Sequence, residues 1–398
     1  MKSLLAVCAP GLEEIVAQEL RDLGLKTEAA PRFGSGGVSF EGSILDAQRA
    51  NLHLRCADRV LVPLGEFHAA SFPELEKRAS RLPWESYLAP GRPVSLRVSS
   101  QKSRLYHESA VAQRLPGAIG KKIGKVPTVV KCGEEANPVN PQLIMVRLES
   151  DLCTVSIDSS GELLHRRGYR LATAKAPLRE TLACAVLKAS GWDAGCPLLD
   201  PFCGSGTIPI EAALLARRLP PGRARRFAFM DWPHFDAPAW EKLSAESGAQ
   251  PAASPRIMAS DRDAGAVRAA QANAERAGVA DAIEFSCRAI SAIEPPPAPG
   301  WLVTNPPYGV RLKGGKDLRD LYAQFGKVLR AGCAGWHAAL LCGDARLLAS
   351  TGLRFQTRLT TLNGGLKVSL ASTKLLQLPR TAISRTGHPG PDPRPPSA

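Results

Sequence analysis

The stretch "PLLDPFCGSGTIPIEAALLA" (Pro197–Ala216) has the pattern of a short buried strand, a glycine-bearing turn and an apolar helix. Gly204 and Gly206 permit a tight turn and a close approach of the backbone to a ligand, as in nucleotide-binding strand–loop–helix units. The dinucleotide fingerprint needs a third glycine where this chain has Pro209, and no P-loop G-K-[ST] pattern is present. Asp200 at the strand end therefore favours a ligand that offers an ammonium group and hydroxyls over one that offers phosphates.

The segment "RIMASDRDAGAVRAAQANAERAG" (256–278) predicts the next strand of the same sheet, which ends at Asp261 and leads into a helix. An acidic side chain after the second strand of such a sheet can accept hydrogen bonds from both ribose hydroxyls of a nucleoside. The alternative role for Asp261 is a helix N-cap. The glycine loop upstream favours the ligand role.

A third segment, "WLVTNPPYG" (301–309), predicts the fourth strand of the sheet, whose carboxyl end lies beside the glycine loop. Two prolines cannot continue a sheet ladder, so they end the strand in a rigid loop. In this loop the Asn305 amide oxygen and the Pro306 carbonyl are two acceptors suited to the amino group of a nucleobase. Tyr308 supplies a ring on which that base can stack. An inert turn is the alternative, and the two preceding motifs argue against it.

Strand-like and helix-like pieces alternate around these three segments, which predicts a parallel sheet with crossover helices. Nearer the N-terminus, Leu4–Val7 and "GGVSFEG" resemble strands, and apolar positions from Leu12 to Leu23 keep helical spacing. Ser43 is suited to cap a second helix that runs through Leu54. This small strand–helix–strand–helix unit predicts a ferredoxin-like α/β element.

The composition points to a polyanionic partner and away from several other classes of protein. The chain has 51 Lys and Arg against 37 Asp and Glu, a net charge of +14. No apolar run is long enough to span a bilayer, so we expect a cytoplasmic protein. The ten cysteines include no C-x-x-C pair, so we expect reduced thiols and no metal site.

Basic residues gather in three segments, "PVSLRVSSQKSRLYH" (93–107), "GKKIGK" (120–125) and "HRRGYR" (165–170). A single run of this kind is most simply a solvated surface. Two runs within one small N-terminal module favour a surface that binds RNA phosphates. The predicted RNA-binding residues are Arg97, Lys102, Arg104, Lys121, Lys122, Lys125, Arg166, Arg167 and Arg170.

The motif D-P-F-C-G-S-G-T followed by N-P-P-Y resembles the class I S-adenosylmethionine-dependent methyltransferases that modify amino nitrogens of bases. The segments "HRRGYR", "APLRETLA" and "ANLHLRCADRVLVPLGEF" narrow the resemblance to THUMP-domain RNA methyltransferases. Within these, the chain looks like the bacterial 23S ribosomal RNA guanine-N2 branch, whose members are often labelled N6-adenine DNA methylases. The resemblance extends to about residue 379 and includes "NGGLKVSL".

The resemblance implies a domain order and a set of site residues. It implies a ferredoxin-like domain (1–57), a THUMP RNA-binding domain (58–158), a Rossmann-like methyltransferase domain (159–385) and a disordered tail (386–398). The residues that it assigns to S-adenosylmethionine are Thr181, Asp200, Phe202, Gly204, Ser205, Gly206, Thr207, Asp261, Arg262 and Asn305. The catalytic residues that hold the target base are Asn305, Pro306, Pro307 and Tyr308.

Two positions depart from the family pattern. Arg288 stands near the place where the family has an acid that recognises adenine, and Val310 stands where Glu usually follows N-P-P-Y-G. The implied reaction is methyl transfer to guanine N2 in 23S ribosomal RNA or a large-subunit assembly intermediate, with no membrane and no obligate protein partner. Open alternatives are an adenine-N6 DNA or RNA methyltransferase, a tRNA guanine-N2 enzyme and a non-catalytic RNA-binding assembly factor.

Overall fold

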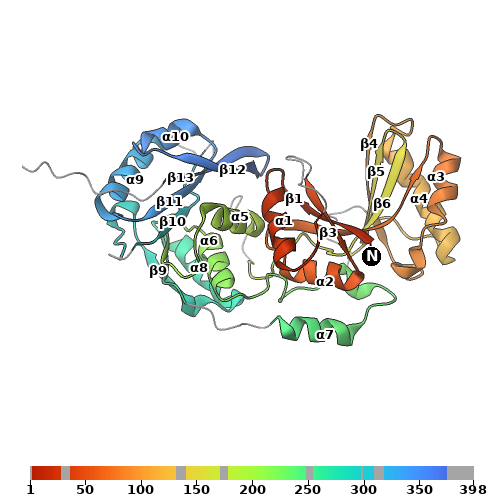
Figure 1. Ribbon diagram of the computed structural model, residues 1–398, viewed down its shortest axis with the longest axis horizontal. Coiled ribbons are helices and arrows are strands. Elements are labelled where there is room, and N and C mark those ends of the chain that lie inside the picture. The colour runs from red at the N-terminus through yellow and green to blue at the C-terminus, as the bar shows by residue number, and fades with distance from the viewer. Residues whose placement is uncertain are drawn as a thin grey trace, which may run out of the picture.

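Two lobes, each built on one β-sheet, make up the chain in the computed structural model (Figure 1). The structure describes residues 2–27, 36–130, 140–170, 178–247, 254–296, 299–308 and 318–373. Within these ranges the N-terminal sheet has the order β2-β1-β3-β6-β5-β4 and the C-terminal sheet the order β12-β13-β11-β10-β7-β8-β9. The predicted α/β class, with a ferredoxin-like start and a Rossmann-like C-terminal sheet, is confirmed.

The first part of the N-terminal lobe is the predicted strand–helix–strand–helix unit. Its elements are β1 (Lys2–Cys8), α1 (Glu13–Asp22), β2 (Gly37–Gly42) and α2 (Ile44–His53). Ser43 caps α2 as predicted: its hydroxyl accepts from the Asp46 backbone N–H, and the Asp46 carboxylate accepts from the Ser43 N–H in return. This capping box fixes where the helix begins.

The long strand β3 (Ala57–His68) joins this unit to the rest of the lobe. Its first residues pair antiparallel with β1, its later residues pair antiparallel with β6, and Leu61 pairs with both. The expected boundary between the ferredoxin-like domain (1–57) and the THUMP domain (58–158) therefore falls at the start of a strand that both parts of the lobe share. The remaining elements are α3 (Phe72–Ala79), β4 (Val94–Gln101), α4 (Glu108–Ile123), β5 (Gln142–Glu149) and β6 (Leu152–Asp158).

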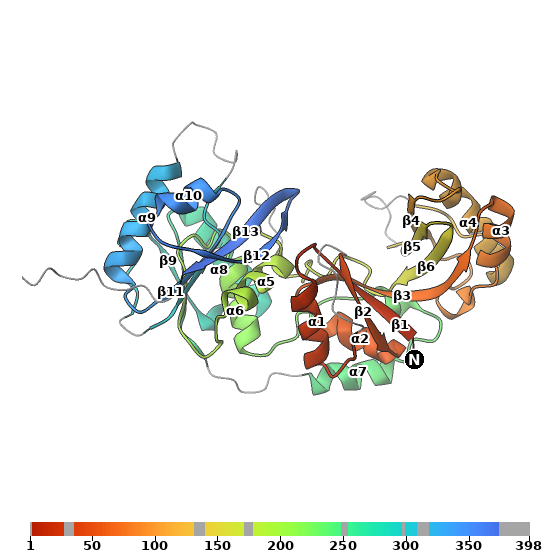
Figure 2. The same cartoon turned by 45° about the horizontal axis from the view of Figure 1, so that its top comes forward.

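Buried polar contacts tie α2 to the segment that leads from β6 towards the C-terminal lobe. Asn51 on α2 donates to the Ser159 hydroxyl (2.7 Å) and accepts from the Ser160 hydroxyl (2.6 Å), just after β6. Helix α7 (Ala237–Glu246), which comes from the C-terminal half of the sequence, lies below α2 (Figure 2). The N-terminal lobe is thus held from both halves of the chain.

The C-terminal sheet has a parallel core that ends in an antiparallel hairpin. The parallel strands are β7 (Leu198–Asp200), β8 (Ile257–Asp261), β9 (Ile283–Cys287), β10 (Trp301–Thr304) and β11 (His337–Cys342). The hairpin consists of β12 (Gln356–Asn363) and β13 (Leu366–Thr373). Strand β10 pairs with β7, so the predicted fourth strand does lie beside the strand that leads into the glycine loop.

Helices cover both faces of this sheet. Their bounds are α5 (Glu180–Ser190), α6 (Thr207–Ala216), α8 (Ala264–Ala277), α9 (Leu318–Gly332) and α10 (Ala345–Ser350). Phe325 and Leu329 on α9 pack with Leu302 in one apolar cluster, whereas α5, α6 and α8 contribute to the other. None of the helices in the described part of the chain has the length and apolar character needed to cross a membrane.

Candidate functional site

The glycine loop between β7 and α6 is shaped by two backbone positions in the left-handed region. Gly204 has φ +53° and Gly206 has φ +85°. A Cβ at Gly206 would lie 2.9 Å from the Cβ of Ala270 on α8, so only glycine permits this close approach. At Gly204 a Cβ would meet no atom within 4 Å, which leaves open space beside the loop.

Polar side chains tie the loop to the neighbouring strand ends. The Asp261 carboxylate, at the end of β8, accepts from the Gly204 N–H (3.0 Å), and Asn273 on α8 donates to the Ser205 carbonyl (2.9 Å). Asp200 is buried and accepts from both the Phe202 N–H (3.2 Å) and the Thr304 hydroxyl (2.6 Å). Burial raises the pKa of Asp200 to about 7.

The end of β10 carries an unusual amide group. The Asn305 side-chain oxygen is buried and has no hydrogen-bond partner among the described residues. Buried acceptors are nearly always paired, so an orphaned one marks a place where a donor is expected to bind. The Pro307 carbonyl, two residues on, accepts from the Tyr322 hydroxyl (3.2 Å), which holds the proline segment against α9.

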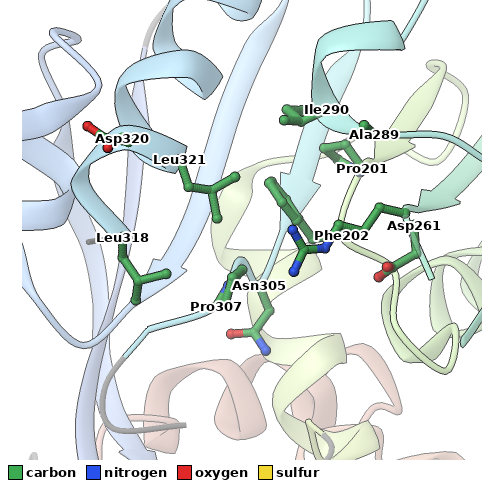
Figure 3. Close-up of a pocket in the computed structure, with 11 residues that line it drawn as sticks. Pro201, Phe202, Asp261, Ala289, Ile290, Asn305, Pro307, Leu318, Asp320 and Leu321 are labelled. Carbon is green, nitrogen blue, oxygen red and sulfur yellow. The ribbon is translucent and has the colours of Figure 1, made fainter. Parts of the chain in front are cut away.

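These segments meet at a cavity of about 720 Å³ (Figure 3). The wall includes five of the predicted site residues, from three different strand ends: Phe202, Asp261, Arg262, Asn305 and Pro307. Sequence reasoning missed the apolar part of the wall, which comes from Ala289, Ile290, Leu318 and Leu321. Phe202 lies in the middle of the group, and its ring packs edge-on against Phe325 at 5.4 Å between centroids.

Tyr308 does not offer its ring to this cavity, which differs from the prediction. Its side chain is 4% exposed, and a Cβ at Gly343 would lie 3.2 Å from the tyrosine ring. The hydroxyl accepts from the Asn363 amide at the tip of the β12–β13 hairpin (2.8 Å). Asn363 was not singled out from the sequence, although the "NGGLKVSL" segment that contains it carries part of the family resemblance.

Both threonines that the resemblance assigns to the cofactor have internal contacts. Thr181, at the start of α5, is buried, and its hydroxyl donates to Asp58 on β3 (3.5 Å). Thr207, at the start of α6, is also buried and accepts from the Arg170 guanidinium (2.5 Å). Neither residue lies among the described residues that line the cavity.

Arg167 and Arg170 are corrections to the predicted RNA surface, because both are used inside the protein. Arg167 is 2% exposed in its side chain, forms an ion pair with Glu211 (2.6 Å) and donates to the Arg55 carbonyl (2.7 Å). Tyr169 donates to the same Glu211 (2.9 Å). Arg170 pairs with Glu180 (3.4 Å) besides its contact with Thr207. Arg167 thus links the two lobes and Arg170 holds the starts of α5 and α6, whereas Arg166 is exposed.

The other predicted RNA contacts are exposed but lie at two separate places. Lys102 and Arg104 precede helix α4, with Arg97 on the edge strand β4. Three lysines lie at or just beyond the other end of α4: Lys121, Lys122 and Lys125. The helix has 16 residues, so its two ends are about 24 Å apart.

The two departures from the family pattern have different outcomes. The Arg288 side chain pairs with Glu294 (3.0 Å), and its backbone N–H donates to the Asp261 carbonyl (2.9 Å). The cavity wall at this place is instead formed by the next two residues, Ala289 and Ile290. Val310 and the tail (386–398) lie outside the described residues. Within the described ranges no cluster of His, Cys, Asp and Glu is suited to hold a metal ion.

Fold and site together define a class of protein. A parallel sheet that closes with an antiparallel hairpin, a glycine loop after its first strand and Asn-Pro-Pro-Tyr after its fourth are the features of a class I methyltransferase. The family model for the RMKL-like methyltransferase domain matches residues 167–371, and the model for the RlmL ferredoxin-like domain matches residues 3–61. The chain belongs to the RlmL-like methyltransferase family, which confirms the resemblance.

Relatives cover nearly the whole chain. A Synechocystis protein, slr0064, named as a candidate RNA methyltransferase, is 34% identical over 93% of this chain and 96% of its own length. The ribosomal RNA large subunit methyltransferase K/L of Allochromatium vinosum is 36% identical over 96% of this chain and 52% of its own length. That of Methylococcus capsulatus is 35% identical over 93% and 50%. The chain thus spans about half the length of these two K/L proteins.

Solved structures share the whole architecture. The candidate methyltransferase SMU.472, crystallised with SAH, has a TM-score of 0.82 and 32% identity, and the match covers 95% of this chain and 99% of that one. A Listeria monocytogenes protein described as a predicted N6-adenine-specific DNA methylase has a TM-score of 0.80 and 32% identity, with coverage of 93% and 95%. TrmN from Thermus thermophilus, at 22% identity and a TM-score of 0.66, shares the fold.

Proposed function

We propose that this chain methylates the exocyclic N2 amine of a guanine in 23S ribosomal RNA. As a member of its family it is an S-adenosylmethionine-dependent RNA methyltransferase, and the choice of base and of RNA is the proposal. The orphaned Asn305 oxygen supports an exocyclic amine as the target, because an amino group on a planar base supplies the donor that this buried acceptor lacks, and the choice of guanine follows the family resemblance. The K/L relatives, named as large-subunit ribosomal RNA methyltransferases, support the choice of RNA.

The cavity fits S-adenosylmethionine as the methyl donor. Its volume of about 720 Å³ lies within the range of sites that enclose small molecules. Gly204 leaves open space at the loop, and Asp261 keeps spare lone pairs for the ribose hydroxyls while it accepts from the loop. Phe202 and Ile290 supply apolar walls. When bound, this cofactor supplies an electrophilic methyl group on a sulfonium centre.

The other proposed cofactor residues act mainly by shaping the loop. The Asp200 carboxylate accepts from Phe202 in the glycine loop and from Thr304, the residue before Asn305, so it links the loop to the end of β10. Arg262 lines the cavity beside Asp261. Thr181, Ser205 and Thr207 fix the helix starts and the loop backbone around the site.

The residues after β10 activate the target amine. The lone pair of guanine N2 is delocalised into the ring, so the free amine is a weak nucleophile. Hydrogen bonds accepted by Asn305 and by the Pro306 carbonyl draw the nitrogen towards a tetrahedral geometry and strengthen as positive charge develops on it. Holding the amine in line with the methyl group removes much of the entropic cost of the encounter. No covalent enzyme intermediate is required.

The target base has to be unpaired or flipped out of its helix to reach this cavity. We assign RNA recognition to the N-terminal lobe, with residues 58–158 as the THUMP domain. RNA is read largely through shape and through single-stranded loops and ends. The exposed cations at both ends of α4 support this assignment.

The proposal is tested with purified protein, labelled S-adenosylmethionine and separate 23S ribosomal RNA, tRNA and DNA substrates. We expect transfer to 23S ribosomal RNA only, with N2-methylguanosine found after nucleoside digestion. N6-methyladenine as the product, or transfer to tRNA or DNA alone, would contradict the choice of substrate. Cofactor binding without transfer to any substrate would favour the non-catalytic assembly factor.

A further inference from the structure

A loop on the N-terminal lobe presents an aromatic pair to solvent. Tyr106 is 66% exposed, and its ring centroid lies 4.1 Å from that of His107. Among the large apolar side chains exposed in the described part of the chain, Tyr106 is the only aromatic one. The loop connects β4 to α4, in the half of this lobe that lies away from the methyltransferase sheet (Figures 1 and 2).

The loop that carries Tyr106 is firmly braced. The Ser103 hydroxyl donates to the Gln101 carbonyl (3.0 Å) and accepts from the Asp151 N–H (3.0 Å). The Asp151 carboxylate accepts in turn from the Arg104 N–H (2.7 Å), which ties the loop to the β5–β6 turn. Leu105 is buried directly before Tyr106. The exposed ring is therefore held in place on a fixed backbone.

Three cations lie on the same loop as the ring or on the strand before it, and the two nearby acids accept backbone hydrogen bonds. Within the described ranges neither Arg97 nor Lys102 has an acidic partner, and Arg104 is exposed with only a long contact to Asp151 (3.8 Å). Glu108, directly after the aromatic pair, accepts from the Ser100 N–H (3.1 Å). The patch therefore presents positive charge, which complements phosphates.

A shallow groove of about 430 Å³, which shares Arg97 with this patch, lies between the edge strand β4 and the first turns of α4. Leu96, Val98 and Ala112 give it apolar walls. Val129, which is exposed, closes one side, and Arg97 and Glu108 lie along it. Proteins hold single-stranded nucleic acid with aromatic rings on which bases stack and with cations that follow the phosphate backbone. This patch and the apolar groove beside it offer both kinds of group.

We propose that an unpaired base of the RNA substrate stacks on Tyr106, with the flanking phosphates at Arg97, Lys102 and Arg104. This stacking site deepens the proposed function, since it takes the methylated RNA as its ligand, but it lies on the other lobe from the methylation cavity. Because every base has a π face, the site holds single-stranded RNA without reading its sequence.

The test measures binding of a fluorescein-labelled oligouridylate to the full chain by fluorescence anisotropy. We expect Tyr106→Ala to weaken binding about 10-fold and Tyr106→Phe to keep it, because phenylalanine retains the stacking face. Leu45→Ala is the matched control, since Leu45 is an exposed apolar residue on α2 of the same lobe. Lys102→Ala is expected to lower the slope of log affinity against log salt by about one ion, which Tyr106→Ala leaves unchanged.

Unchanged affinity of Tyr106→Ala for the oligouridylate would overturn the stacking site. An equal loss on a blunt RNA duplex without unpaired bases would also overturn it, because a ring cannot stack on paired bases there. The outcomes are separable from those of the proposed function. If the wild-type chain methylates 23S ribosomal RNA and Tyr106→Ala binds the oligouridylate normally, only the stacking site is contradicted. If the chain methylates no RNA but Tyr106→Ala weakens binding of the oligouridylate, only the proposed function is contradicted.

Discussion

The carboxyl edge of the seven-stranded sheet and the outer edge of the six-stranded sheet are built in opposite ways. At the first edge, polar groups such as Asp200 and Asp261 are bonded to the loop backbone, and the Asn305 side-chain oxygen in the cavity wall has no partner among the described residues. At the second, Arg97 and Lys102 extend into solvent without acidic partners among the described residues. The first arrangement fixes one small ligand in one geometry, whereas the second suits a polyanion held by several weak contacts.

The same contrast separates two adjacent arginines, and it gives the largest expected effect. Arg167 is buried against Glu211, whereas Arg166 is 65% exposed in its side chain and pairs with Glu162 (3.1 Å). We expect Arg167→Ala to lower the free energy of unfolding by about 3–5 kcal/mol, because it leaves the buried Glu211 carboxylate without its cationic partner. Arg166→Ala is the control and is expected to cost less than about 1 kcal/mol. Urea denaturation measures both, and equal costs would break the comparison.

Removal of the orphaned acceptor is expected to act on turnover alone. Asn305→Ala should lower kcat by about 10²–10³-fold, because the hydrogen bond it removes strengthens in the transition state. Affinity for S-adenosylmethionine, measured by calorimetry, is expected to stay within about twofold of the wild type, since Asp261 and Phe202 remain. Loss of cofactor binding in this variant would assign Asn305 to the cofactor instead of the base.

Asp200, at the carboxyl edge of the seven-stranded sheet, is expected to make the stability of the protein depend on pH. Burial raises the pKa of this carboxyl from 3.8 to about 7, so the folded chain holds a proton that the unfolded chain has released. The stabilisation is full below about pH 4 and is lost as the pH rises towards 7. We expect wild-type stability to fall relative to Asp200→Asn by roughly 1 kcal/mol per pH unit in this window.

Asn is a suitable replacement at position 200 because its carboxamide oxygen can still accept from Phe202 and Thr304. Thermal unfolding of both proteins across the pH range measures the difference. A difference that stays constant with pH would show that Asp200 is already ionised in the folded chain.

A single cation at the solvent-exposed edge is expected to give the smallest effect. Lys121→Ala should weaken RNA binding only a few-fold and lower the salt slope by about one ion, because one phosphate contact is lost. Lys242→Ala on α7 is the control, since this lysine is also exposed and lies on another element. If Lys121→Ala lowered RNA affinity as strongly as Asn305→Ala is expected to lower kcat, RNA binding would depend on one fixed contact.

The cavity edge was predictable because parallel strands end at a common edge. Asp261 and Asn305 each follow a recognisable strand, so their convergence on the glycine loop follows from topology. The packing of Tyr308 was not predictable, since its partner Asn363 is 55 residues away along the chain. Nor could a run of arginines reveal that Arg167 turns inwards and Arg166 outwards, because no periodic pattern marks the buried side. The wider placement of domain limits stays a prediction.

The shared strand β3 fixes the two parts of the N-terminal lobe relative to each other. A hinge between the two parts of the N-terminal lobe would have to interrupt a strand whose ladder passes from β1 to β6 at Leu61. The two parts of the N-terminal lobe are therefore held at a fixed distance from each other. Under the proposed function and with the proposed stacking site, an RNA would be selected by the spacing between its unpaired segment and its target guanine.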